Sequence, residues 1–193
     1  MSLSEEVLQK LRQLAWAETE KYGTPIPEHF VISEQKGIEL AEKLGVDVNI
    51  VKAGCYLMDC KLGQALKEGK IQDHVAMSSK WGSEWLSELR VDDDLKNKVI
   101  NCIEAHHGAV PFSCLEAEIC ANADCYRFLS ARGFFAYMTL LGKRDSEDLD
   151  KNLQFMESKI DEKHKILSLD ICKKETEENY QMFKKLIMKS RKN

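Results

Sequence analysis

Histidines and aspartates spread along the chain are the side chains of this sequence that could do chemistry. They are His29, Asp59, His74, the adjacent pair His106 and His107, and Asp124. Imidazole combined with carboxylate is a ligand set typical of Mn, Fe, Zn or Ni, and less so of Mg. A divalent ion held in this way can lower the pKa of a water molecule and orient a phosphoryl oxygen. The residue types therefore predict a metal site, provided that the fold brings them together.

Asp59 is the member of this set that most needs a partner. It falls in the middle of a predicted helix, in an apolar segment where an unpaired carboxylate would be costly to bury. Metal coordination would remove that cost, and so would an ion pair with an arginine or lysine. His74 has the alternative of a surface position, and the pair His106 and His107 could end a helix favourably through its dipole. The occurrence of all these residues in one order favours the metal site over separate explanations.

Helices are predicted almost throughout, because apolar residues recur at helical spacing and sustained β-alternation is absent. The predicted helices cover about 4–23, 29–44, 47–63, 73–89, 93–105, 113–129, 147–167 and 171–190. The fold class is therefore all-α. We expect a single domain over 1–193, with a core at about 27–130 and C-terminal helices at about 147–190.

The segments between these helices are less regular. Two glycines and mixed charge predict an exposed loop over 63–72. Ser113 and Glu116 have the spacing of a capping box at the start of a helix. Residues 134–141 should form a short helix or a packed loop. The last two helices are expected to fold back as a hairpin on the bundle, because their apolar stripes need a partner surface.

Composition limits the function classes. The chain has 193 residues and a net charge of −4, and its Lys and Arg residues do not alternate with aromatic residues, so a nucleic-acid polymer is not expected as partner. No apolar run approaches the roughly 20 residues needed to cross a membrane. The first residues lack the pattern of a signal peptide. The seven cysteines form no CxxC pair and suit reduced core positions, so we expect a cytoplasmic protein.

The order of the candidate residues resembles the HD superfamily of metal-dependent phosphohydrolases. The resemblance rests on His29 in an early helix, the run AGCYLMD ending at Asp59, and His74 at the start of the next helix. It continues with IEAHH at the end of a helix and with SCLEAEICANADCYRFL, which contains Asp124. The resemblance covers nearly the whole chain and implies an HD-type helical bundle.

In the family, one metal is held by a first His, by both residues of a His-Asp pair and by a last Asp. The matching positions here are His29, Met58, Asp59 and Asp124. Met58 departs from the family pattern, and a neutral thioether is a poor ligand for hard or borderline divalent ions. The resemblance then leaves three ligands in this first set.

Members with two metals share the Asp of the pair and add the later histidines. Here the second set is Asp59 and His74 with His106 or His107, and it is whole. Met58 leaves three outcomes open: one metal held by the remaining ligands, a weakly working site, or lost catalysis with a retained pocket.

The resemblance also suggests roles in the reaction. Asp59, His74 and His106 are the expected catalytic residues, and His74 with His106 or His107 could instead help to protonate a leaving group. Lys61, Lys80 and Arg127 are the candidates for contact with a phosphate, since cations stabilise the charge of a transferring phosphoryl group.

The expected function is metal-dependent hydrolysis of a phosphate ester such as a nucleotide, with Mn, Fe, Ni, Zn, Co or Mg as cofactor. The expected partner is a small phosphorylated substrate, without a nucleic-acid polymer or a membrane, and the terminal hairpin could serve a homodimer. The alternative is a catalytically degenerate HD-fold protein that binds a phosphorylated small ligand or a protein partner.

Overall fold

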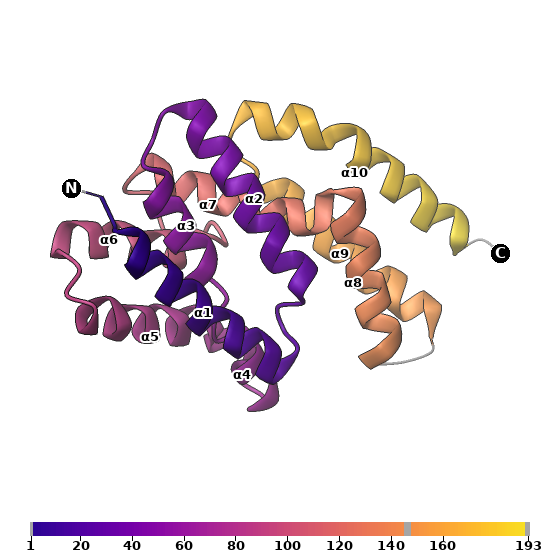
Figure 1. Cartoon of the computed structure of the whole chain (residues 1–193). Coiled ribbons are helices and arrows are strands. Elements are labelled where there is room, and N and C mark those ends of the chain that lie inside the picture. The colour runs from indigo at the N-terminus through magenta and orange to yellow at the C-terminus, as the bar shows by residue number, and fades with distance from the viewer. Residues whose placement is uncertain (1, 145–147, 192–193) are drawn as a thin grey trace.

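The computed structural model describes residues 2–144 and 148–191, which form helices joined by short connections (Figure 1). The helices are α1 (Glu5–Tyr22), α2 (Pro27–Leu44), α3 (Val48–Leu57), α4 (Leu62–Lys67), α5 (His74–Glu88), α6 (Asp93–Ala105), α7 (Leu115–Leu129), α8 (Ala131–Arg144), α9 (Leu149–Ile166) and α10 (Asp170–Ser190), with a 3-10 turn, η1, over Ile71–Asp73. No strand occurs in these two ranges, so the predicted all-α class is confirmed.

Local sequence signals place several helix ends correctly. The side chains of Ser4 and Asp47 accept hydrogen bonds from backbone N–H groups in the first turns of α1 and α3. Gly23 and Gly45 follow α1 and α2 with φ of 66° and 70°, a left-handed conformation that only glycine adopts freely. These ends fix where the second helix begins and therefore where His29 lies.

Of the exposed loop predicted over 63–72, the exposure is confirmed for residues 66–72, but the loop conformation is wrong for most of the range. Leu62–Lys67 form α4, and Ile71–Asp73 form the 3-10 turn η1. Gly63 is buried against α1, where an added Cβ would lie 2.4 Å from the Cβ of Tyr22. The glycine thus permits close packing of two helices, which composition alone does not distinguish from a loop.

Two predictions after α6 also need correction. Ser113 and Glu116 form no capping box, because α7 begins at Leu115 and the backbone N–H of Ser113 donates to the side chain of Asn101. Residues 134–141 belong to a longer helix, α8. The two C-terminal helices form as predicted, although residue 147 lies outside the described residues.

Helix α7 is the centre of the bundle. Nearly all of its residues after the first are buried, and it packs against α2, α3, α6, α8, α9 and α10. Gly54 brings α3 close to it: an added Cβ would lie 2.6 Å from both the Cβ of Cys102 and the Sγ of Cys120. All seven cysteines are free, and six of them are buried, as the sequence predicts.

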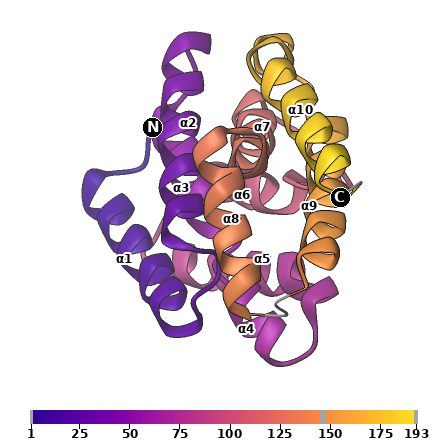
Figure 2. The same ribbon diagram turned by 90° about the vertical axis from the view of Figure 1, so that its right-hand side faces the viewer.

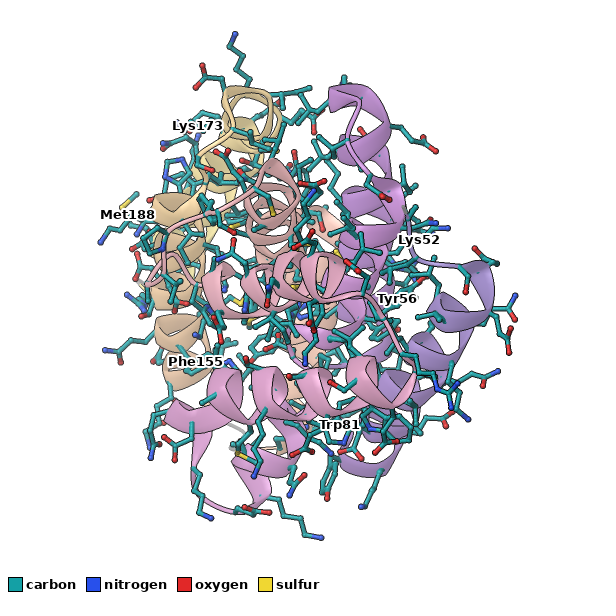
Figure 3. All side chains as sticks on the ribbon, turned by 90° about the vertical axis from the view of Figure 1, so that its left-hand side faces the viewer. Lys52, Tyr56, Trp81, Phe155, Lys173 and Met188 are labelled. Carbon is teal, nitrogen blue, oxygen red and sulfur yellow. The ribbon has the colours of Figure 1, made fainter. Side chains whose placement is uncertain are left out.

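The last three helices cover one side of this bundle. Figure 2 shows α8 running between the α2 side of the molecule and the pair α9 and α10. In Figure 3, Phe155 on α9 and Met188 on α10 lie on the opposite side of the view from Tyr56 on α3. No helix within the described ranges is long and apolar enough to span a membrane.

Candidate active site

Asp59, His74 and His106 come together from three different elements. Asp59 follows α3, His74 is the first residue of α5, and His106 follows α6. The Nε2 atoms of His74 and His106 lie 3.4 Å and 3.5 Å from the same oxygen, Oδ1 of Asp59. With His107, these residues form a group whose nearest ligand atoms all lie within 4.8 Å of one another. This is the predicted second ligand set, and the fold assembles it.

Hydrogen bonds orient two of these imidazoles toward Asp59. The Nδ1 atoms of His74 and His106 lie 2.6 Å from the carbonyl oxygens of Ile71 and Ile103. A carbonyl oxygen only accepts, so each Nδ1 carries the proton and each Nε2 presents a lone pair. Neither Oδ1 of Asp59 nor Nε2 of His106 has a hydrogen-bond donor among the described residues, although both are buried. Acceptor atoms that face one another in this way fit a cation.

The charges around Asp59 keep this ligand ionised. Burial alone would raise its pKa, but the charge of Arg127 and the two histidines hold the pKa of Asp59 well below its usual range. Burial lowers the pKa of His74, while Asp59 raises it more, so the net pKa of His74 is raised. A metal ion at Nε2 of His74 would have to compete with a proton, so its binding would weaken as the pH falls.

His107 has a different role from its neighbour. Its Nδ1 lies 3.1 Å from the ammonium of Lys163, which can only donate, so the ring proton is on Nε2. That Nε2–H donates to Nε2 of His74 at 3.1 Å. Burial, His106 and Lys163 lower the pKa of His107 to about 3, so the ring is neutral at neutral pH. The acceptor atoms of the group are thus Oδ1 of Asp59 and Nε2 of His106, which have no donor among the described residues, and Nε2 of His74, which an ion would take over from His107. His107 is a hydrogen-bond donor beside them.

The predicted first metal set is filled by protein cations. One guanidinium nitrogen of Arg127, Nη1, donates both to Oδ2 of Asp59 and to Oδ1 of Asp124, the latter at 2.7 Å. Lys163 Nζ donates to the other oxygen of Asp124 at 2.5 Å. Burial would raise the pKa of Asp124, but Lys163 and Arg127 hold it well below its usual range. Asp124 is therefore an ion-pair partner, and the prediction that it ligates a metal does not fit this geometry.

His29 also points to a protein group. Its Nε2 donates to the carbonyl of Gly133 at 3.1 Å, and its ring stacks on Tyr137 with 5.2 Å between centroids. Burial is the main cause that lowers the pKa of His29 to about 3. Gly133 can pack against the end of α7 because it lacks a side chain: an added Cβ would lie 2.2 Å from the carbonyl oxygen of Arg127. With Met58 buried as well, the first set does not fit a metal ion.

Two of the three residues predicted to bind phosphate lie away from the site cavity. Lys61 pairs with Glu18 at 3.0 Å and lies over the ring of Trp81, and it does not line the site cavity. Lys80 is exposed on α5, and six residues after His74 it lies roughly 240° around the helix. Only Arg127 reaches the site.

Lys163 is a site residue that the sequence did not reveal. It lies in the charged run DEKHK, yet its side chain is only 2% exposed. The available signal was its spacing, because Met156, Ile160 and Lys163 follow the i, i+4, i+7 pattern of the buried face of α9. A lysine on an apolar stripe needs a buried acidic partner, which here is Asp124.

The site lies in a cavity of about 380 Å³. Asp59, His74, His107, Asp124, Arg127 and Lys163 line its polar part. Its walls are largely apolar and include Leu62, Leu66, Ile71, Leu140 and Phe155. The rings of Tyr137 and Phe155 are nearly parallel, with centroids 6.1 Å apart. Arg144 and Lys159 add two further cations to the lining.

Comparison with known proteins gives one relative and one similar structure, and no family model matches the chain. The relative is Ribonuclease Y from Finegoldia magna, 36% identical over 104 residues, which cover 53% of this chain and 18% of that protein. The structure is a predicted HD superfamily hydrolase from an uncultured Thermotogales bacterium, with a TM-score of 0.68 and 15% identity over 94% of this chain and 90% of that one. The fold expected from the resemblance is confirmed, because this chain has the fold of that predicted HD superfamily hydrolase. Met58–Asp59 stands where the resemblance expects a His-Asp pair.

Proposed function

We propose that this chain is a metal-dependent phosphohydrolase that acts on a small phosphate ester, with a nucleotide as the first candidate. The observation that carries the proposal is the convergence of Asp59, His74 and His106 with lone pairs on one point beside a cavity. Two histidines and a carboxylate suit Mn, Fe, Ni, Co or Zn better than Mg. Such an ion, when bound, would act as a Lewis acid on a phosphoryl oxygen and lower the pKa of a water molecule.

The residues of the chain would divide the remaining tasks. Arg127, paired with both carboxylates, brings a fixed positive charge to the polar end of the cavity, where charge develops on a transferring phosphoryl group. His107 carries a proton on Nε2 and receives a hydrogen bond from Lys163, which suits it to donate a hydrogen bond to a phosphoryl or leaving oxygen. His29 and its stacking partner Tyr137 give the cavity part of its aromatic wall.

The shape of the cavity supports a compact substrate. Its volume of about 380 Å³ is at the small end of ligand pockets, which commonly span roughly 300 to 1,000 Å³. Cations at one end and apolar and aromatic walls elsewhere suit a phosphate joined to a flat or apolar group. The curated relative is named as a ribonuclease, and a nucleotide ester agrees with that name. The net charge of −4 argues against a polymer substrate. The seven free cysteines support a reducing compartment such as the cytoplasm.

The proposal is tested by metal content and turnover together. We expect purified chain to retain one of Mn, Fe, Ni, Co or Zn, and to hydrolyse a member of a panel of nucleotides and a generic phosphate ester. Asp59→Ala should lower both metal affinity and turnover by at least about 100-fold, because it removes the one carboxylate among the three proposed ligands. Asp161→Ala is the control, since this aspartate on α9 pairs with Lys184 on α10, outside the site cavity.

A binding protein without catalysis is the second candidate, and the cations in the first metal set favour it over a two-metal enzyme. Metal retention without turnover on any panel member, combined with saturable nucleotide binding, would support this alternative. Equal metal content in the wild-type chain and Asp59→Ala would contradict both the enzyme and its proposed centre.

A further inference from the structure

Asp124 occupies the position of a metal-ligating carboxylate, yet cations already contact both of its oxygens. Arg127 Nη1 lies 2.7 Å from Oδ1, and Lys163 Nζ lies 2.5 Å from Oδ2. The same Nη1 donates to Oδ2 of Asp59. The guanidinium therefore lies between the two carboxylates that an ion of the first set would have to bridge.

The surrounding helices hold these cations in place. Asp124 and Arg127 are three residues apart on α7, so they share one face of the central helix. Lys163 reaches the other oxygen of Asp124 from α9. The side chains of Arg127 and Lys163 are 4% and 2% exposed. Movement of Arg127 into solvent would leave Asp59 without its ion-pair partner, and movement of Lys163 would leave Oδ2 of Asp124 without its donor. Both changes are unfavourable at buried carboxylates.

Charge balance gives the same result. The negative charges of Asp59 and Asp124 are offset by the positive charges of Arg127 and Lys163. A divalent ion added between the carboxylates would lie beside the guanidinium in a buried environment, where like charges repel strongly. On the other side of Asp59, Oδ1 faces the two imidazoles of His74 and His106 and no cation.

We propose that Arg127, together with Lys163, permanently replaces a first metal ion, so that the site takes one divalent ion instead of two. The one remaining ion site is the one formed by Asp59, His74 and His106, and this assignment rests on the proposed function. Met58 then has a physical explanation, because a guanidinium in the first position leaves no ion for an imidazole to bind. Arg127 lines the cavity, and its planar group can meet phosphoryl oxygens where an ion would otherwise do so.

The first test restores the missing histidine. In Met58→His the guanidinium of Arg127 stays between the carboxylates. We therefore expect Met58→His to bind the same number of Mn²⁺ ions per chain as the wild type, measured by elemental analysis after desalting. One additional ion in Met58→His would overturn the proposal.

The second test removes the guanidinium as well. Met58→His/Arg127→Gln should bind one Mn²⁺ more than Met58→His, and Mn²⁺ should raise its unfolding temperature more. Met58→His/Arg127→Lys keeps a cation and should stay at the count of Met58→His. An equal count in the Gln variant and Met58→His would refute the role of Arg127. Failure of the Gln variant to fold with Mn²⁺ present would also count against it, because the ion should replace the lost charge.

The control for arginine loss in general is Met58→His/Arg12→Gln. Arg12 pairs with Glu34 outside the site, with two hydrogen bonds of 2.8 and 2.9 Å, so this variant should gain no ion. A wild-type chain that binds no Mn²⁺ would remove the proposed ion site. The difference of one ion between the Gln variant and Met58→His would still decide whether Arg127 replaces a metal.

Discussion

Asp59 divides its carboxylate between two environments at the centre of the site. Oδ2 accepts from Arg127, whereas Oδ1 faces the Nε2 atoms of His74 and His106. One oxygen is thus neutralised by the protein, and the other is available to an ion. Of the two explanations that the sequence left open for Asp59, the ion pair is observed at Oδ2, and the metal is the proposal for Oδ1.

His29 makes a residue-scale prediction about pH. Its pKa is about 3 in the folded chain, mainly because of burial, and near 6.5 in an unfolded chain. Between these values the unfolded state binds one more proton, so lowering the pH from 7 to 5 should cost the fold about 2 kcal/mol through His29. In urea unfolding, His29→Gln should lose less stability than the wild type over this range by about that amount.

The control for this pH effect is His164→Gln, because His164 lies in the C-terminal hairpin and bonds to Glu177. It should keep the pH dependence of the wild type. Since His74 and His107 are present in all three proteins, their own titration cancels in the comparison. The same pH dependence in His29→Gln and in the wild type would show that the buried ring is not the cause.

Helix ends place most of the site residues. The last four carbonyl groups of a helix lack partners within the helix. Ile103 lies in the last turn of α6, and its carbonyl accepts from Nδ1 of His106 three residues later. The carbonyl of Ile71 in η1 does the same for His74. Each imidazole is thereby oriented by a backbone carbonyl three residues before it in the chain.

Close helix packing at Gly54 gives a prediction at the element scale. An added Cβ would lie 2.6 Å from the Cβ of Cys102 on α6, which cannot move without its helix. We expect Gly54→Ala to lower the free energy of unfolding by about 1 to 3 kcal/mol, measured by urea denaturation.

Gly142 on α8 is the matched control, because an added Cβ there would meet nothing within 4 Å. Gly142→Ala should therefore be neutral or stabilise the fold by up to roughly 1 kcal/mol, since alanine restricts the unfolded chain more than glycine. Equal effects of the two substitutions would show that α3 does not need this close contact with α6.

At the scale of the whole molecule, the cavity exists because the C-terminal helices cover the bundle. Tyr137 from α8 and Phe155 and Lys163 from α9 line it, and these helices pack against α7 (Figure 2). The polar end of the cavity comes mainly from the N-terminal two thirds of the chain, and the apolar wall mainly from α4, α8 and α9. Substrate choice should therefore depend on residues that are far in sequence from the metal ligands.

Metal binding should also stabilise the whole fold, because the ligands come from elements that are separate in the unfolded chain. An ion at a hundredfold excess over its Kd stabilises by about 2.7 kcal/mol. For a chain of this size, that corresponds to a rise in Tm of roughly 5 to 10 °C. A thermal unfolding scan with each candidate ion measures the rise, and a chelator should reverse it. Asp59→Asn should abolish the rise, and a wild-type Tm that no ion changes would contradict the metal centre.

The sequence alone predicted the all-α class and most helix ranges, because helical periodicity and caps are local properties. The family resemblance, not local pattern, indicated the group of Asp59, His74 and His106 or His107. It did not predict the packing of Gly63, the direction of Lys61 or the burial of Lys163, since each depends on the element packed against it. The tertiary structure alone decided the fate of the first metal set. Arg127 and Lys163 reach Asp124 from two helices, and the pairing of buried charges across helices is visible only when the chain is folded.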